Sequence, residues 1–458
     1  MIEEVQSLQR ERSRHIGALG LEHRLYALSQ IKRLLVEHEE EWLAALNADL
    51  HKHPVEAYAS EISVLLNEID FIQKKLRMWL KSDSKRRLLL SGTDKVVTTR
   101  QPYGSVLVIA PWNYPLQLAL MPVIGALAGG NGVVLKPSES APTTSHLLNT
   151  LIPVYFPKKV IHVIEGDHIV SEKLTALQWD FIFFTGSPET GKKVYEAAAR
   201  NLTPVLLELG GKNPCILDES GMTPDAIKKI IWGKFLNAGQ SCIASDTVYV
   251  PREQLPLVLE MMKKQIIAFY GENPQVSPDY GRIVHTEHFE RVVSFLDDGH
   301  IYYGGDASKE ARYIGPTLLI DVAPGSPAST EEIFGPILPV VPYDSLATVI
   351  ESLEAAPAPL CTYIFSKDAY TQKQITTATR SGAVSINEVM VQAVNPFVAF
   401  GGVGESGLGK YHGEASFQAF TYPQPVYVKG TSVTLAKQFP PYSQVALRTL
   451  RKLRRKIF

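Results

Sequence analysis

The spacing of apolar residues divides the chain into two regions with different expected elements. Over residues 1–80, apolar side chains recur every three or four positions among charged ones, as at Leu25, Leu28, Ile31 and Leu35. This period places them on one face of a helix. The spacing therefore predicts amphipathic helices in this region.

From about residue 104 onward, short continuous apolar runs alternate with helix-like segments. One set of runs precedes Gly210 and a second follows it: Val106–Ala110, Val133–Leu135, Val160–Ile164, Phe181–Phe184, Val205–Leu207, and then Cys215–Leu217, Val248–Val250, Thr317–Ile320, Ile337–Val341, Thr362–Phe365 and Val384–Ile386. Apolar strands separated by helices indicate parallel sheets that are covered on both faces. We therefore expect two α/β units, the first with a doubly wound sheet.

Length and composition limit the class of protein. A chain of 458 residues exceeds the roughly 250–300 residues at which single cores stop growing, so two large domains are expected. The formal net charge of −1 gives no basic excess for binding nucleic acid. The polar N-terminus does not resemble a secretory signal. The apolar stretch 115–130 is too short to span a bilayer and predicts a buried helix.

The three cysteines, Cys215, Cys242 and Cys361, are odd in number and form no C-x-x-C pair. This spacing argues against a disulfide framework and against a zinc site, so no metal is predicted. A reducing compartment, the cytoplasm, suits such a chain best. Cys215 and Cys361 lie in strand-like runs and are expected to be core residues.

The last fourteen residues, 445–458, have a composition of their own. Six of them are Arg or Lys, and four apolar residues would share one helix face: Leu447, Leu450, Leu453 and Ile457. A basic amphipathic helix of this kind suits weak contact with an anionic membrane surface. A solvated or frayed tail is the alternative.

The run Phe181–Thr185 leads directly into a glycine turn, Gly186 to Gly191. Ser187 is a good helix N-cap and Pro188 suits the first helical position. Free N–H groups at such a helix start attract anions, so the turn predicts a pyrophosphate site. A purely structural strand-to-helix turn is the alternative.

Two other glycine patterns are weaker signals. The turn nearly spells a P-loop, but Lys193 stands where the motif needs a Ser or Thr hydroxyl for magnesium. Residues 402–407 match G-x-G-x-x-G, yet Gly409 and Gly413 interrupt any following helix. We interpret 402–407 as a structural loop.

Three residues are candidates for chemistry. Cys242 ends Gly239-Gln-Ser-Cys242, a glycine-rich approach compatible with an accessible thiol, although cysteines are more often buried and inert. Glu208 ends an apolar strand, where desolvation would raise its pKa and make it a usable base, unless it only marks the strand end. Asn113, between aromatic residues and prolines, could donate to an oxyanion or merely cap the next helix.

Together these segments resemble the aldehyde dehydrogenase superfamily over nearly the whole chain, and most of all its class 3, fatty-aldehyde branch. The motifs occur in the family's order: PWNYP at 111–115, KPSE at 136–139, FTGSPETG at 184–191, ELGGK at 208–212, GQSC at 239–242, EEIFGP at 331–336 and FGGVGESGLGKYHG at 400–413. Ordered matches of this number are far more specific than any single motif.

The resemblance implies a mechanism. Cys242 would attack the aldehyde as a thiolate, and Asn113 with the Cys242 backbone N–H would hold the oxyanion. Hydride would pass to NAD, or to NADP, and Glu208 would activate the water that hydrolyses the thioester. The acyl product would be a carboxylic acid.

The resemblance also implies how the cofactor is held. Lys136 and Glu139 would lie at the adenosine ribose. The carboxylate of Glu139 would repel the 2′-phosphate of NADP, so NAD is the expected cofactor and NADP remains possible. The remaining cofactor residues would be Gly186, Ser187, Gly191 and Leu209 around the pyrophosphate turn, with Glu332 at the nicotinamide ribose and Phe334 beside the ring.

The domains implied are an NAD(P)-binding domain at 1–207, a catalytic domain at 208–395, a return segment at 396–430 and a tail at 431–458. The fold is α/β, with a Rossmann-type cofactor domain and a small β arm, near 83–103 and within 396–430, that pairs two subunits into a homodimer.

Two features concern the substrate. Tyr114 and Trp232, beside two of the motifs, are expected in the substrate pocket and suggest a medium or long apolar aldehyde. Gln392 stands where relatives commonly have histidine, which leaves a titratable role there in doubt. A CoA-acylating or semialdehyde-specific relative and a catalytically silent one remain alternatives. Glu208 favours hydrolysis over acyl transfer to CoA, because a base is needed to activate water.

Overall fold

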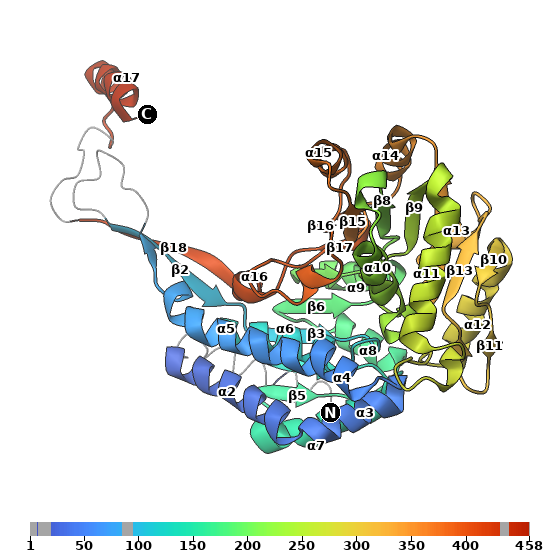
Figure 1. The fold of residues 1–458 in the computed structure, drawn as a ribbon. Helices are drawn as coiled ribbons and strands as arrows, with labels where there is room; N and C mark the ends of the chain where they lie inside the picture. The colour runs from blue at the N-terminus through green and yellow to red at the C-terminus, as the bar shows by residue number, and fades with distance from the viewer. Residues whose placement is uncertain (1–6, 8–19, 85–94, 431–438, 458) are drawn as a thin grey trace.

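The computed structural model describes residues 7, 20–84, 95–430 and 439–457. It contains two large sheets with helices packed around them and a small antiparallel arm that extends away from both (Figure 1). The expected fold, two α/β units with a β arm, is confirmed.

The first large sheet has six strands in the order β17-β7-β6-β3-β4-β5, and every pair except β17–β7 is parallel. The five parallel strands match the first set of apolar runs to within one or two residues: β3 Ser105–Ile109, β4 Gly132–Lys136, β5 Ile161–Val163, β6 Phe181–Thr185 and β7 Val205–Glu208. They are almost entirely buried, which is why their sequences are continuously apolar. The short β17, Gly407–Leu408, begins in the G-x-G-x-x-G segment, which was interpreted as a loop, and pairs antiparallel with β7.

The helices beside this sheet are α6 Gln117–Gly129, α7 Pro142–Tyr155, α8 His168–Ala176 and α9 Pro188–Ala199. Every residue of α6 is buried, so the apolar stretch is a core helix as predicted. No helix among the described residues is long and apolar enough to cross a membrane.

The predicted N-terminal helices are confirmed from residue 21 onward, and residues 1–6 and 8–19 lie outside the described part of the chain. They are α2 Leu21–Glu37, α3 Glu39–Leu50, α4 Pro54–Ala57, the π-helical turn η2 Tyr58–Ile62 and α5 Ser63–Trp79. Their apolar faces cover α6 and α7, because the same cluster of buried residues runs through α2, α3, α5 and α6.

The second large sheet has seven strands in the order β10-β13-β14-β9-β8-β15-β16. Six of them match the second set of apolar runs: β8 Pro214–Leu217, β9 Thr247–Pro251, β13 Thr317–Ile320, β14 Ile337–Tyr343, β15 Cys361–Phe365 and β16 Ala383–Ile386. The seventh, β10 His300–Tyr303, is an exposed antiparallel edge strand. The sequence did not predict this strand, because its residues do not form a continuous apolar run. The main helices of this unit are α10 Pro224–Phe235, α11 Leu255–Tyr270, α12 Thr286–Ser294, α14 Leu346–Ala355 and α15 Ala369–Ala378.

The arm consists of β1 Asp83–Ser84, β2 Lys95–Pro102 and β18 Thr421–Val428. β2 and β18 pair antiparallel from Thr421 opposite Pro102 to Val428 opposite Lys95. The tail helix α17 Gln444–Ile457 lies at the far end of the arm (Figure 1). The predicted tail helix is therefore present, although the side chains of its last residues lie outside the description.

The strand register brings the functional segments to one edge of the first sheet. Ile109 of β3 lies beside Phe184 of β6, and Thr185 lies beside Glu208 of β7. Because parallel strands end at the same edge, the segments that follow β3, β6 and β7 emerge together.

Candidate active site

Cys242 follows an unusual turn at the end of α10. After Phe235 comes the 3-10 turn η4, Leu236–Gly239, in which Asn237 and Ala238 both have φ of 52° and Gly239 has φ of 75°. A Cβ on Gly239 would lie 2.2 Å from the carbonyl oxygen of Gly335, so only glycine can occupy this position. Residues held in left-handed conformations by their surroundings are frequent at active sites.

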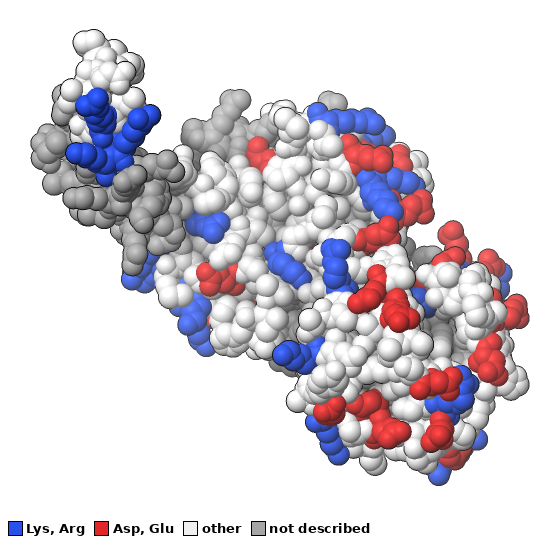
Figure 2. Space-filling model, turned by 90° about the horizontal axis from the view of Figure 1, so that it is seen from above, with Lys and Arg blue, Asp and Glu red and all other residues white. Residues whose placement is uncertain are grey.

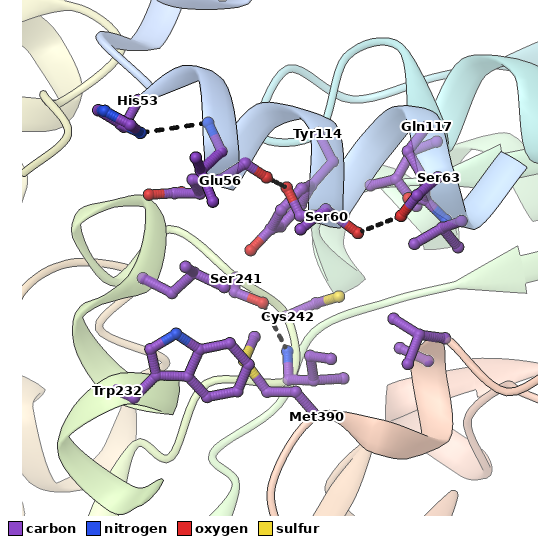
Figure 3. A pocket seen from close by; sticks show the side chains of 18 of the residues that line it. His53, Glu56, Ser60, Ser63, Tyr114, Gln117, Trp232, Ser241, Cys242 and Met390 are labelled. Carbon is purple, nitrogen blue, oxygen red and sulfur yellow. Dashed lines mark hydrogen bonds between the residues drawn. The ribbon is translucent and has the colours of Figure 1, made fainter. Parts of the chain in front are cut away.

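Two cavities meet at Cys242. The first, about 740 Å³, is lined by Tyr114 and Trp232 as well as Cys242. The second, about 850 Å³, contains the glycine turn after β6. Cys242 lines both, together with Leu118, Phe400 and Tyr411. Figure 3 shows the first cavity, with Tyr114, Trp232 and Met390 around Cys242. Cys242 as a residue is partly exposed, whereas Cys215 and Cys361 are fully buried as expected.

Glu208, at the end of β7, lines the second cavity and is only 3% exposed. Neither of its carboxylate oxygens has a hydrogen-bond partner among the described residues. Burial raises the pKa of Glu208 well above its usual range, and the nearby Lys410 ammonium opposes that shift. A carboxylate with a raised pKa accepts a proton more readily than an exposed glutamate does, which suits a general base.

Asn113 also lines the second cavity and is buried. Its side-chain Nδ2 donates to the carbonyl of Gln240 at 3.1 Å. An amide nitrogen carries two N–H groups, so a second donor remains for a ligand. The N-cap of α6 is Leu116, so the alternative that Asn113 caps this helix is wrong.

The thiol of Cys242 lies among acidic groups. Its pKa is raised well above the usual value, first by burial and then by the nearby Glu332, Cys361 and Glu208. Protonation of the two carboxyls would weaken this effect. The backbone N–H of Cys242 has the opposite effect, because its hydrogen bond to the sulfur lowers the pKa of the thiol.

The turn after β6 has the geometry of an anion site. The Ser187 Oγ accepts from the Thr190 N–H at 3.2 Å, and Pro188 is the first residue of α9. A Cβ on Gly186 would lie 2.5 Å from the Phe184 ring, and one on Gly191 would lie 2.5 Å from the Leu209 side chain. The glycines therefore let the helix start approach the sheet closely.

Glu332 and Phe334 reach the same cavity from the segment before β14. Burial raises the pKa of Glu332 to about 8, and Asp246 adds to the shift. The Glu332 side chain lies so close to Gly210 that a Cβ there would be 1.9 Å from its Oε2. Phe334 has φ of 53° and packs edge-on against Trp112, with ring centroids 5.3 Å apart.

The structure gathers five of the eight predicted cofactor residues in the lining of the second cavity: Gly186, Ser187, Leu209, Glu332 and Phe334. Gly191 lies directly behind Leu209. Lys136 and Glu139 do not line this cavity. They form an ion pair at 2.5 Å near the end of β4, with Lys136 buried. Their strand neighbours β3, so the pair lies on the same sheet edge.

Gln392 lines neither cavity and instead makes hydrogen bonds within the protein. Its Nε2 donates to the Tyr363 hydroxyl and to the Cys361 sulfur, both at 3.0 Å, and its Oε1 accepts from the Ser385 hydroxyl. The Tyr363 hydroxyl in turn donates to the carbonyl of Ile243 at 2.6 Å. An uncharged amide at this position thus supports the residue next to Cys242 without titrating.

Several cavity residues were not predicted from the sequence. Phe400 and Tyr411 belong to the last motif, in which the glycines dominate the pattern and the aromatic residues carry no signal of their own. Glu56 and Asp279 come from distant helical and loop segments that carry no motif. The Glu56 carboxylate accepts from the Asn237 N–H at 2.9 Å, and burial raises the pKa of Glu56 to about 7.

Comparison with known proteins agrees with this geometry. Residues 3–426 match the aldehyde dehydrogenase family. The chain is 48% identical to a 4,4'-diapolycopene-4,4'-dial dehydrogenase of Cytobacillus firmus, over 90% of this chain and 91% of that protein. It is 39% identical to aldehyde dehydrogenase family 3 member A2 of Pongo abelii, over 93% and 88% of the two chains. The expected likeness to the class 3 branch is therefore confirmed.

Two further comparisons bear on assembly and fold. A dimeric NADP-preferring aldehyde dehydrogenase of Canis lupus familiaris is 38% identical, over 92% of this chain and 93% of its own length. The solved structure of Staphylococcus aureus AldH in a substrate-bound state superposes with a TM-score of 0.96 at 38% identity, over 99% of both chains. With a cysteine at the junction of two cavities and the family's motifs around it, the chain belongs to the aldehyde dehydrogenase family and is an NAD(P)-dependent oxidoreductase that converts aldehydes to acids.

Proposed function

We propose that this enzyme oxidises apolar aldehydes of medium or long chain, through a thioester on Cys242. The observation that carries the proposal is that Cys242 lies where two cavities meet. It lines a mainly apolar cavity on one side and, on the other side, the cavity that contains Asn113 and Glu208.

The cofactor cavity contains groups that suit NAD(P). The N-terminal N–H groups of α9 favour a pyrophosphate. The buried Thr185 Oγ1 and Glu332 Oε1 both lack a hydrogen-bond partner among the described residues, and both residues line this cavity. Ribose hydroxyls could satisfy these oxygens. When bound, the nicotinamide supplies the hydride acceptor.

The residues of this chain carry the other steps. The Cys242 sulfur, as a thiolate, attacks the carbonyl carbon of the aldehyde. The developing oxyanion accepts N–H bonds from the Asn113 side chain and the Cys242 backbone. Loss of the hydride leaves a thioester. Glu208 then takes a proton from water while the water oxygen bonds to the thioester carbon. The carbon–sulfur bond breaks, which releases the carboxylic acid and restores the Cys242 thiolate.

The lining of the first cavity supports the substrate class. Apart from Glu56 and Asp279, which are acidic, its walls are mostly apolar or aromatic, and none of the described lining residues is Lys or Arg. Such a cavity favours uncharged, apolar aldehydes and disfavours semialdehydes that carry a carboxylate, because like charges repel. The relative named for a long polyene dialdehyde agrees with this class.

Reduced cofactor, followed by absorbance at 340 nm, tests the proposal across a panel from acetaldehyde to decanal, with succinate semialdehyde as the anionic member. We expect kcat/KM for decanal to exceed that for succinate semialdehyde by at least about 100-fold, since each buried CH₂ contributes about 0.8 kcal/mol. Above about pH 8, where Glu56 with its raised pKa of about 7 is ionised, Glu56→Gln should narrow this ratio by relieving repulsion of the anionic aldehyde. Equal use of both aldehydes would contradict the substrate class. An absorbance increase that requires free CoA would favour a CoA-acylating dehydrogenase. No increase with any aldehyde would favour a catalytically silent relative.

We also propose NAD as the preferred cofactor, because Glu139 would repel a 2′-phosphate on the adenosine ribose. Glu139→Gln is expected to raise kcat/KM with NADP about 10-fold while leaving that with NAD within about twofold. Initial rates with each cofactor at fixed decanal measure the change, and the NAD value serves as the internal control. An unchanged NADP to NAD ratio would show that Glu139 lies away from the ribose.

We further propose that the enzyme is a cytoplasmic homodimer paired through the arm, with weak membrane contact through α17. β18 lies at the edge of the arm and is exposed except at Thr421, and a relative is named as dimeric. Exposed strand edges favour pairing with a second chain. Lys and Arg gather on the far end of the molecule where α17 lies (Figure 2), and Val445, Leu447 and Leu450 of this helix are exposed.

Deleting residues 445–458 separates the last two proposals. We expect the truncated chain to keep its activity and to sediment as a dimer, at slightly less than twice the 50.7 kDa of one full-length subunit. Its co-sedimentation with phosphatidylserine vesicles should be lost, because basic residues near the surface each contribute about 1 kcal/mol. Vesicle binding that survives the deletion would contradict membrane contact by the tail. A single-subunit mass for the full chain would contradict the dimer.

A further inference from the structure

A buried ion pair lies behind the segment that carries Asn113. The Lys52 ammonium donates to the Glu61 carboxylate at 2.5 Å, and both side chains are fully buried. Neither residue lines either cavity at Cys242. Burying two charges costs free energy that a close pair offsets only with further hydrogen bonds, so a buried pair by itself is weak support for stability.

Those further hydrogen bonds all go to the 111–117 segment. The Lys52 Nζ also donates to the backbone carbonyl of Asn113 at 2.9 Å, and it lies 4.0 Å from the centre of the Tyr114 ring. The second oxygen of Glu61 accepts the backbone N–H groups of Leu116 and Gln117, at 2.9 and 3.1 Å. The pair therefore holds the middle and the C-terminal end of the short loop between β3 and α6.

The contacts of Glu61 replace a missing helix cap. α6 begins at Gln117, and its N-cap residue Leu116 has no side chain that can accept a hydrogen bond. A carboxylate at a helix N-terminus satisfies free N–H groups and favours the dipole. Glu61 itself lies in the π-helical turn η2, a rare conformation that is frequent at functional sites.

Asn237 completes the frame around Asn113. Its Nδ2 donates to the carbonyl of Asn113 at 2.8 Å and to the carbonyl of Gln240 at 3.1 Å, the same Gln240 carbonyl that receives the Asn113 side chain. The segment before Cys242 and the segment that carries Asn113 are thereby joined. The Lys52–Glu61 pair fixes this joined unit without itself lining either cavity.

We propose that Lys52 and Glu61 are positioning residues for the reaction, which hold the Asn113 amide where the oxyanion develops next to Cys242. This inference rests on the proposed role of Asn113. An oxyanion donor is effective only when its N–H is already placed before the charge forms. Loss of the pair should therefore lower kcat and leave KM almost unchanged, because neither residue lines the cavities that would hold the aldehyde and the cofactor.

The test compares the neutral pair variant Lys52→Met/Glu61→Gln, which keeps an acceptor for the two amides, with the matched control Asp49→Asn. The buried carboxylate of Asp49 accepts the N–H groups of Thr143 and Thr144 at the start of α7, as Glu61 accepts those at the start of α6. Like Glu61, Asp49 lines neither cavity, but its hydrogen bonds go to α7 and not to the segment that carries Asn113. The readouts are the single-turnover rate of cofactor reduction, kcat, KM and the melting temperature of the full chain.

We expect the pair variant to lower the single-turnover rate at least about 10-fold with KM within about threefold, and Asp49→Asn to change the rate less than about twofold. The same pair substitution is then made in an Asn113→Ala background. There it should change the rate by less than about twofold, because the group that it positions is gone.

Three results would overturn the inference. The pair variant could keep the wild-type rate, it could lower the rate equally in the Asn113→Ala background, or Asp49→Asn could lower the rate as much, which would indicate a general loss of rigidity. A fourth result is distinct: if Asn113→Ala itself keeps the wild-type rate, the proposed oxyanion role fails and the positioning role fails with it.

Discussion

Cys242→Ala is expected to abolish aldehyde oxidation, with kcat reduced by at least about 10⁴-fold, the scale on which removal of a nucleophile acts. No other cysteine can replace it, because Cys215 and Cys361 are fully buried in their strands. Binding of NAD should be unchanged, since the residues at the glycine turn are untouched. Steady-state rates at 340 nm and NAD titration by calorimetry measure the two effects.

Thiol labelling gives an independent check on Cys242. Burial and the nearby carboxyls raise the pKa of this thiol, so its thiolate fraction should increase with pH throughout the range from about 7 to 9. Alkylation by iodoacetamide should follow the same increase and should modify Cys242 alone, as peptide mass spectrometry would reveal. Residual turnover in Cys242→Ala, or preferential labelling of Cys361, would contradict the assignment.

Glu208→Gln is expected to stop the reaction after the first turnover. The thioester should still form, because Cys242 and Asn113 are intact, but no base remains to activate water. We expect a burst of reduced cofactor equal to the enzyme concentration, followed by a steady-state rate reduced about 10²- to 10⁴-fold. Intact-protein mass spectrometry should find the acyl group on the chain. Cys242→Ala serves as the control that gives no burst.

The raised pKa of Glu208 also predicts pH effects. As a base it acts only when ionised, so hydrolysis of the thioester should accelerate as pH rises towards its raised pKa. For stability the sign is opposite. A carboxyl whose folded pKa exceeds its unfolded value of about 4.5 stabilises the fold below that value, and this contribution is lost as pH rises through the folded pKa.

Glu208→Gln should consequently gain in melting temperature relative to the wild type as pH rises, with the largest gain at alkaline pH. Thermal unfolding at several pH values measures this difference. A constant difference between pH 5 and about 9 would indicate that Glu208 is already ionised in the fold, with Lys410 as its counter-charge.

The sequence by itself determined the parallel strands of both sheets and the motif residues at Cys242. Strands buried on both faces must be apolar throughout, so β3, β6 and β15 appear as continuous runs. Edge strands escape this requirement, and β10 was missed for that reason. The family motifs added Cys242, Glu208 and Asn113, because chemistry restricts which residue types can serve there.

Only the tertiary structure decided which residues surround those motifs. Glu61 lies 55 positions before Leu116 and Glu56 lies 181 positions before Asn237, yet each pair shares a hydrogen bond. The spacing of residues along the chain does not predict such contacts, because they depend on how α4, η2 and α6 pack against one another in the folded protein. The role of Gln392 was hidden for the same reason. Its partners Cys361 and Tyr363 lie on β15, and no pattern in the sequence around Gln392 indicates that this strand is its neighbour.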